Sequence, residues 1–279
     1  MLDADTIVVG SGAGGLTAAL ALARTGERVL VLEQHAHAGG LCHSFYRGGH
    51  RFSPGVHYIG QLGRGGSLRR IYEGLGVADD LAFFEMNPSG FEHIRIGEEV
   101  FDLPAGKDAM VESFTTRFPD QARGIKDYLG LLDTVCREMA CIPETRSFVD
   151  FVTVPFRTWN MGRYGLYSLD RILRDRISDP LLRALLSIQC GDHGLPPSRI
   201  PFVMHAPVAG HYMDGACYPL GGAGTIPNAL ITGLRKEGGD IRLSAEVEKI
   251  LIENKGGRPA AIGVRLTGGT ELRANRVIS

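Results

Sequence analysis

Residues Thr6 to Gly40 read TIVVGSGAGGLTAALALARTGERVLVLEQHAHAGG, and this stretch decides the fold. Its β-branched start, Thr6–Val9, predicts a short strand buried on both faces. The motif G-x-G-x-x-G follows at once, with its glycines at Gly10, Gly12 and Gly15. In such a motif the first glycine permits a tight turn, the second lets the backbone approach a diphosphate, and the third lets a helix pack closely on the strand.

A helix, a second strand and an acidic residue complete this unit. Residues 16–24 are rich in Leu and Ala, which favour a helix, and residues 28–32 predict a strand that Glu33 closes. The helix N-terminus offers unpaired N–H groups to a diphosphate. Glu33 follows Gly15 by 18 residues, where a carboxylate accepts hydrogen bonds from a ribose diol and disfavours a 2′-phosphate there. The stretch therefore predicts a dinucleotide site; the alternative is a glycine-rich turn in another kind of parallel sheet.

A second glycine pair, Gly39-Gly40-Leu41, comes just after the acidic residue. This arrangement resembles the flavoprotein superfamily that includes glutathione reductase and amine oxidases. The resemblance implies that the extra glycines run beside the phosphates and ribityl chain of FAD, a loop that simple nicotinamide dehydrogenases do not need. We therefore expect FAD rather than NAD as the cofactor.

Composition points to an ordinary globular protein with one large or two modest domains. The chain has 279 residues, 44% hydrophobic and 22% charged, and a net charge of −1 gives no indication of a nucleic-acid partner. Five cysteines without a C-x-x-C pair indicate reduced thiols and disfavour a disulfide reductase. Residues 1–5 lack the basic start of a signal peptide, and no apolar run reaches the ~18 residues of a transmembrane helix. We expect a cytoplasmic location.

Two further motifs carry a resemblance to a known family. They are GHRFSPGVHYIG at 49–60 and GDHGLPPSRIPFVMHAPVAGHYMDGACYPLGG at 191–222. With the glycine turn and Gly39-Gly40-Leu41, they resemble the phytoene desaturase and carotenoid isomerase family of FAD-dependent oxidoreductases, most closely its retinol saturase-like branch. Members of the family usually carry an acid where Ser53 stands here, which is a departure from the pattern.

The resemblance implies an α/β fold, in which a Rossmann-like FAD-binding domain of the glutathione reductase and amine oxidase type carries an inserted α+β substrate domain. We expect the FAD-binding domain in two segments, 1–60 and 219–279, with the substrate domain at 61–218. Family members run on well beyond Ser279. We therefore expect this chain to be the N-terminal portion of a larger enzyme, truncated at its C-terminus.

The periodicity of the sequence predicts further elements. They are strands at 94–96, 100–103, 241–243, 247–252 and 260–266, a hairpin over 44–53, and helices at 67–75, 108–118, 121–139, 168–177, 180–189 and 225–236. The apolar, aromatic stretch 148–167 contains Arg157, Arg163 and the single tryptophan, Trp159. It predicts either a buried segment of the substrate domain or an interfacial segment that enters a bilayer surface.

The site residues follow from the motifs and from the resemblance. Those expected to bind the cofactor are Gly10, Ser11, Gly12, Ala13, Gly14, Gly15, Glu33, Gln34, Gly39, Gly40 and Leu41, together with Val247, whose backbone the resemblance places by the adenine. If the reaction needs a proton donor, we expect His57 or Tyr58 to supply it. A metal at His43, His50 and His57 is not expected, because the set has no neighbouring carboxylate and no helical i, i+4 spacing.

The implied reaction is hydride transfer between flavin and a carbon–carbon bond of a lipophilic polyene or isoprenoid, in either direction. We expect NAD(P)H or a quinone as the redox partner and a membrane surface as a further one. Three alternatives stay open. They are an amine oxidase-like flavoenzyme, disfavoured by the motif at 191–222, a non-catalytic FAD-binding scaffold, and a nicotinamide-only dehydrogenase, disfavoured by the second glycine pair.

Overall fold

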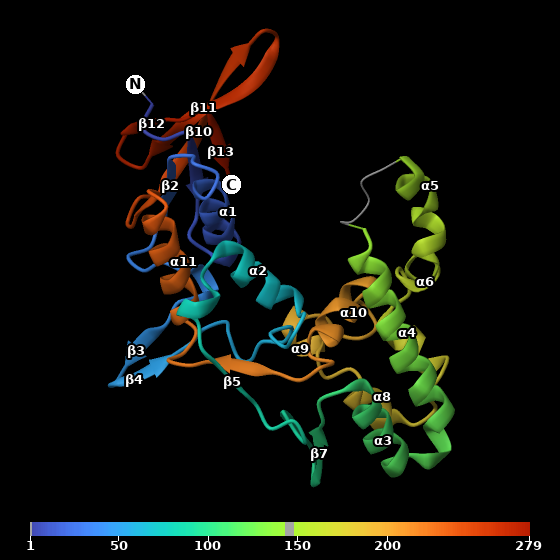
Figure 1. Ribbon diagram of the computed structural model, residues 1–279. Helices are drawn as coiled ribbons and strands as arrows, with labels where there is room; N and C mark the ends of the chain where they lie inside the picture. Colours follow the sequence, from blue (N-terminus) through green and yellow to red (C-terminus); the bar gives the residue numbers. More distant parts are fainter. Residues whose placement is uncertain (1, 143–147) are drawn as a thin grey trace. The chain divides into compact units, whose positions relative to one another are not determined.

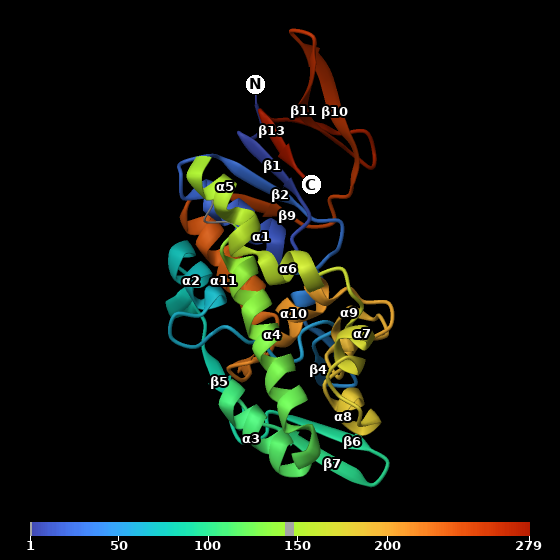
Figure 2. The same ribbon diagram turned by 90° about the vertical axis from the view of Figure 1, so that its right-hand side faces the viewer.

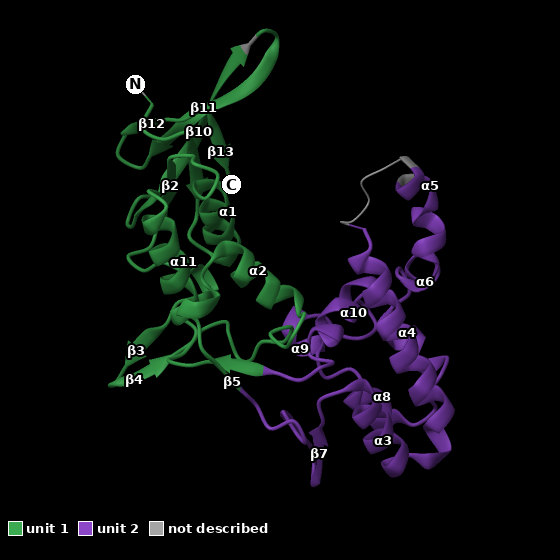
Figure 3. Cartoon of the chain, viewed as in Figure 1, with its two compact units in different colours: residues 1–84, 217–279 green, residues 85–216 purple. Residues whose placement is uncertain are grey.

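The computed structural model describes residues 2–142 and 148–279, which form two compact units (Figure 3). Unit 1 comprises the chain up to Phe84 together with Cys217–Ser279, and unit 2 is Glu85–Ala216. The first border therefore lies at Phe84 rather than near residue 60, the border expected from the sequence. The reason is packing, since α2 (Ser67–Leu75) buries Tyr72 in the core of unit 1.

A four-stranded parallel sheet forms the centre of unit 1. Its order is β13 (Arg276–Ile278), β1 (Thr6–Val9), β2 (Val29–Leu32) and β9 (Asp240–Arg242). Figure 2 shows these four strands side by side. The two strands and the helix predicted within residues 6–32 are present, and α1 (Ala13–Ala23) connects β1 to β2 as the glycine motif predicts.

Alternating side chains of this sheet supply two separate cores. Val8 and Val31 pack with α1, α2 and α11 (Thr225–Lys236), whereas Ile7, Leu30 and Leu32 pack against an antiparallel sheet on the other face. Both faces of β1 and β2 are therefore buried, which explains why their sequences are continuous apolar runs.

The antiparallel sheet contains the strands predicted at 247–252 and 260–266. It consists of β10 (Val247–Lys255), β11 (Arg258–Leu266) and β12 (Glu271–Arg273) in that order. Two smaller pairs complete unit 1. They are the hairpin of β3 (Phe45–Arg47) and β4 (His50–Phe52), and the pair of β5 (Phe83–Glu85) with β8 (Cys217–Pro219). The predicted hairpin over 44–53 is confirmed.

Unit 2 combines one hairpin with helices (Figure 1). The hairpin is β6 (Glu92–Ile96) with β7 (Glu99–Leu103). The helices are α3 (Lys107–Arg117), α4 (Ala122–Ala140), α5 (Phe148–Arg157), α6 (Trp159–Tyr164), α7 (Leu169–Arg174), α8 (Pro180–Leu185), α9 (Cys190–His193) and α10 (Phe202–His211). Helix α4 corresponds to the helix predicted at 121–139, and its Ile125, Tyr128 and Val135 are at 1% exposure or less.

Two expectations for unit 2 differ from the structure. Helix α10 was not predicted, because Pro207 and Gly210 interrupt the helical signal of its sequence. The interpretation of 148–167 as a buried segment is wrong for five of the apolar side chains that the structure describes. Val149, Val152, Phe156, Trp159 and Leu166 are 51–85% exposed. Among the described residues, no helix has both the length and the apolar character needed to cross a bilayer.

Candidate functional site

The glycine turn after β1 has the geometry that its sequence predicts. Gly10 has φ +95°, a left-handed conformation that favours glycine, and a Cβ at Gly15 would lie 2.2 Å from the carbonyl oxygen of Gly10. Gly15 is therefore required for the close approach of α1 to the turn. A Cβ at Gly12 or Gly14 would meet no atom of the protein within 4 Å. Packing does not explain these two glycines, and the open space beside them suits a diphosphate at the N-terminus of α1.

Glu33 is 5% exposed and lies at the end of β2. Its Oε2 accepts hydrogen bonds from the Ser11 N–H (2.8 Å) and the Ser11 hydroxyl (2.6 Å), and its Oε1 accepts one from the His35 N–H (2.9 Å). Burial raises the pKa of Glu33, but the hydrogen bonds from His35 and Ser11 outweigh it, so the pKa lies below its ordinary value. A carboxylate has about four lone-pair positions, which leaves one for a ribose hydroxyl.

Ser11 joins the two glycine segments. Its hydroxyl donates to Glu33 and accepts from the Gly39 N–H (3.1 Å), while Gly12 and Gly39 form an isolated parallel bridge. The Ser11 side chain, expected to bind the cofactor, is therefore occupied by protein contacts and is fully buried. Its position fixes the acid and the second loop against the first turn.

The second glycine pair also needs glycine for close approach. Gly39 and Gly40 have φ +113° and +53°, and a Cβ at Gly40 would lie 3.0 Å from the Cα of Gly12. The structure thus brings residues 10–15, Glu33 and the 39–40 pair together. Gln34 and Leu41 belong to the same loop, but both side chains are exposed, Leu41 by 73%.

Val247, expected beside the adenine, begins β10 and packs against the core that contains Leu32. The Ala245 N–H donates to the carbonyl oxygen of Glu33 (2.8 Å), so the chain entering β10 is tied to the end of β2. The role of Val247 stays a prediction.

His57 and Tyr58, the expected proton donors, lie in unit 1 with their rings edge to face at 4.5 Å between centroids. The next residue, Ile59, pairs with Cys217 through two backbone hydrogen bonds of 2.7 and 2.8 Å. The Ser53 and Tyr218 hydroxyls lie 3.2 Å apart. The motifs at 49–60 and 191–222 therefore meet in space, although no structural observation assigns either side chain a catalytic role.

Sequence reasoning missed a cationic pocket of about 440 Å³ in unit 1. It lies between the loop at 36–46 and α11, and Arg51, Arg235, His37 and His43 line it without any carboxylate. Gly39 adjoins this pocket through Pro227, since a Cβ at Gly39 would lie 2.8 Å from the Cγ of Pro227. Its charge suits an anionic ligand. No local motif signals it, because Arg51 and Arg235 come from distant parts of the chain.

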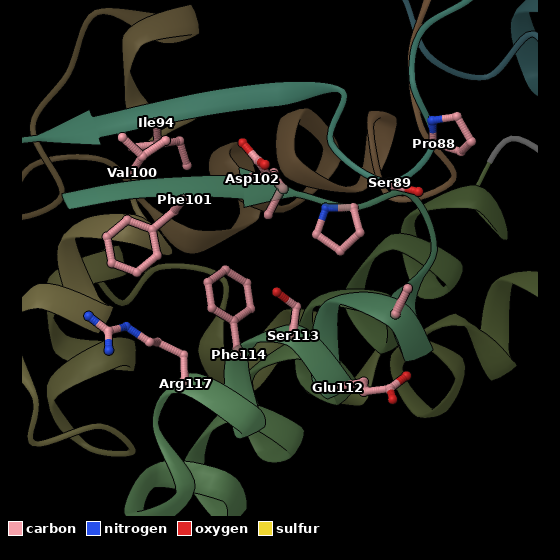
Figure 4. Close-up of a pocket in the computed structure, with 13 residues that line it drawn as sticks. Pro88, Ser89, Ile94, Val100, Phe101, Asp102, Glu112, Ser113, Phe114 and Arg117 are labelled. Atoms are coloured by element: carbon pink, nitrogen blue, oxygen red, sulfur yellow. The ribbon is translucent and has the colours of Figure 1, made fainter.

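Unit 2 contains a pocket of about 540 Å³ of its own (Figure 4). The hairpin β6–β7 and helix α3 enclose it, with Phe101 and Phe114 among its apolar lining and Asp102, Glu112 and Arg117 at its polar positions. This volume lies within the range of small-molecule sites. A second, largely apolar cavity of about 40 Å³ lies beside Tyr128.

The parallel sheet, the open glycine turn, the buried acid and the second glycine loop define a dinucleotide-binding protein of the flavoprotein class. The chain belongs to the family of flavin containing amine oxidoreductases, whose family model matches residues 13–279. This membership confirms the predicted FAD cofactor and the Rossmann-like fold. The glycine turn, Glu33 and the second glycine pair have a geometry that fits this cofactor, and their role in binding it stays a prediction.

Comparison with curated proteins and solved structures agrees with this assignment. The chain is 33% identical to the all-trans-retinol 13,14-reductase of Danio rerio over 99% of its own length and 47% of that protein. It is 28% identical to the chloroplastic prolycopene isomerase of Daucus carota over 99% of its length and 45% of that protein. The structure of putrescine oxidase with bound putrescine is similar at a TM-score of 0.65 and 19% identity, covering 98% of this chain and 57% of that one. The chain spans about half the length of the curated relatives it matches.

Proposed function

We propose that the protein is a FAD-dependent oxidoreductase that acts on a carbon–carbon double bond of a lipophilic polyene. The observation that carries this proposal is the similarity, over nearly the whole chain, to a retinol reductase and a prolycopene isomerase. Both names describe chemistry at conjugated double bonds. The glycine turn, Glu33 and the second glycine pair form a dinucleotide cradle in unit 1, which fits the cofactor that such chemistry needs.

Flavin, when bound, supplies hydride chemistry, and the protein supplies binding, orientation and exclusion of water. The glycine turn and α1 bind the diphosphate, and Glu33 binds the ribose. Saturation of a double bond adds a hydride to one carbon and a proton to the other. We assign that proton to His57 or Tyr58. The backbone pairing of Ile59 with Cys217 joins their segment to the motif at 191–222.

The substrate class also bears on the exposed apolar side chains of α5 and α6. Lipophilic polyenes partition into membranes, and an enzyme that takes them up benefits from contact with a bilayer surface. Phe156 and Trp159 are 80% and 62% exposed, and Arg157 and Arg163 lie among them. We assign this face to peripheral membrane contact, as aromatic and basic side chains suit the interface.

An amine oxidase-like activity is the second candidate, favoured by the similarity in fold to putrescine oxidase. At 19% identity that similarity concerns the fold alone. A flavin-binding protein without catalysis is the third candidate.

The test begins with the absorbance spectrum of the purified chain and mass analysis of the released cofactor. The holoprotein is then incubated anaerobically with a flavin reductant and all-trans-retinol, and in parallel with prolycopene. Chromatography detecting a dihydro product or an isomerised polyene supports the proposal. Oxidation of putrescine with hydrogen peroxide release supports the amine oxidase instead. Bound FAD with no turnover of any of the three substrates supports the non-catalytic protein.

A further inference from the structure

Three side chains of unit 2 whose residue types can ligate a metal lie close together. Cys190 and His193 lie one turn apart on α9, and His205 comes from α10. Donor atoms of the three residues all lie within 4.8 Å of one another. The histidines considered from the sequence, near the hairpin of unit 1, do not belong to this cluster.

Hydrogen bonds within the protein do not satisfy the cluster. The Tyr128 hydroxyl lies 3.3 Å from Nε2 of His205, and Nδ1 of His205 lies 3.3 Å from Nε2 of His193. Nδ1 of His193 is buried and has no hydrogen-bond partner among the described residues. In either tautomer of His193, Nδ1 stays unpaired, as a lone pair without a donor or as an N–H without an acceptor. Such a buried polar atom is costly unless something outside the protein binds it.

We propose that this cluster binds a divalent transition-metal cation, Zn²⁺ by its donor set, through the sulfur of Cys190 and a ring nitrogen each of His193 and His205. One thiolate and two imidazoles are ligands that Zn²⁺ prefers, and Ca²⁺ or Mg²⁺ would require oxygen ligands. Ligation through Nδ1 of His193 supplies the partner that this atom lacks, and Nδ1 of His205 binds the cation in exchange for its contact with Nε2 of His193. Three protein ligands leave a fourth tetrahedral position for water or an exogenous ligand.

The surroundings support the ligand states that a metal needs. His205 has no exposed surface, and a histidine that binds Zn²⁺ is a neutral imidazole with one N–H. Its Nε2–H then donates to the oxygen of Tyr128, whose own proton points to the Leu186 carbonyl oxygen 3.4 Å away. This is the outer-shell arrangement that orients a ligating histidine. The Cys190 thiol releases its proton to solvent when the sulfur binds the cation, so the affinity falls as the pH falls.

The experiment measures Zn²⁺ and Co²⁺ binding by the purified, metal-stripped chain. We expect one equivalent of Zn²⁺ per chain, a rise in melting temperature with added Zn²⁺, and a thiolate-to-cobalt charge-transfer band with Co²⁺. Cys190→Ser is expected to lower the Zn²⁺ affinity by more than roughly 100-fold and to abolish the cobalt band, and His193→Asn to lower the affinity similarly. Tyr128→Phe keeps the ring and removes the outer-shell oxygen, so we expect a loss of about 10-fold.

Cys141→Ser is the matched control, because Cys141 lies in the same unit at the end of α4 and its thiol donates to the Arg137 carbonyl oxygen in that helix. The control should retain the metal, the cobalt band and the melting shift. Binding that is absent in the folded wild-type chain, or that survives Cys190→Ser with its cobalt band intact, overturns the proposal. Circular dichroism of each variant establishes that the chain remains folded, and a variant that unfolds is replaced by the milder His193→Gln.

Discussion

Ser11 shows how one small side chain organises the candidate cofactor site. It donates to Glu33 and accepts from Gly39, so it connects three segments that are separate in the sequence. The cofactor need not touch this side chain for it to matter. The pattern G-S-G-A-G-G places a serine in the turn, but the sequence alone does not show that the hydroxyl points back to the protein.

Replacing Ser11 by Ala should lower both stability and flavin retention. The change leaves the Gly39 N–H with one partner fewer and removes a hydroxyl donor from a buried carboxylate. We expect a loss of about 1–3 kcal/mol in the free energy of unfolding, measured by urea denaturation of the apoprotein. Thr25→Ala is the control, because the Thr25 hydroxyl is exposed and donates to the Leu22 carbonyl oxygen near the end of α1. Its effect should lie within about 0.5 kcal/mol. Equal effects of the two changes would contradict the assigned role.

Glu33 should make stability depend on pH. Its folded pKa is lowered, so its contribution is fully present above the ordinary carboxylate pKa of about 4.3 and is lost as the pH falls through the folded pKa. Glu33→Gln, which keeps the shape without the charge, should therefore be less stable than the wild type at pH 7. The gap between the two urea midpoints should narrow as the pH falls below about 4. A gap that is constant between pH 7 and pH 3 would show that the charge of Glu33 makes no contribution.

At the scale of the element, the glycine turn separates two reasons for glycine. Gly15→Ala puts a methyl group 2.2 Å from the Gly10 carbonyl oxygen, so we expect a loss of about 1–3 kcal/mol in stability together with loss of flavin. Gly12→Ala meets no protein atom within 4 Å, so the apoprotein should stay within about 0.5 kcal/mol of the wild type while FAD is lost. Unfolding curves and the flavin absorbance of the purified variants measure both. Retention of FAD by Gly12→Ala would place the diphosphate elsewhere.

Elements with strong local signals could be predicted from the sequence. Helix α11 begins and ends at Thr225 and Lys236, as its periodicity predicts, and the β3–β4 hairpin follows its Gly-Gly turn. Helix α10 could not be read in the same way. Its Gly210 lies where a Cβ would be 2.5 Å from the sulfur of Cys136, so tertiary packing against α4 explains a glycine that lowers the local helix signal.

At the scale of the whole molecule, sites made by distant segments escaped sequence reasoning. The dinucleotide cradle could be predicted because most of its parts lie within residues 6–40, in an order whose geometry is known. The pocket of Arg51 and Arg235 and the cluster of Cys190 with His205 depend on which helix packs where, and no spacing in the sequence encodes that. The same holds for the exposure of Phe156, since an apolar sequence predicts a buried face as readily as an interfacial one.

The proposed proton donors can be tested in the holoprotein. His57→Ala and Tyr58→Phe should keep the FAD content of the wild type, since neither residue belongs to the dinucleotide cradle. If one of them supplies the proton, its variant should lose roughly 100-fold or more in polyene turnover. His50→Ala, an exposed histidine of β4, is the matched control and should turn over normally. Normal turnover by both the His57 and the Tyr58 variants would remove these residues from the mechanism.

Contact between the α5–α6 face and a bilayer can be followed with the chain's own reporter. Trp159 is the single tryptophan and is 62% exposed, so its emission in water should lie to the red and shift to the blue when the indole enters an interface. We expect this shift, and co-sedimentation of the chain, with vesicles of phosphatidylcholine and anionic phosphatidylserine. Phe156→Glu adds a charge to the same apolar face and should weaken binding by about 10-fold or more. Val100→Glu, a matched change at an exposed site on β7, should leave binding unchanged. Emission that does not respond to vesicles, or equal loss in both variants, would assign the exposed apolar face to another partner.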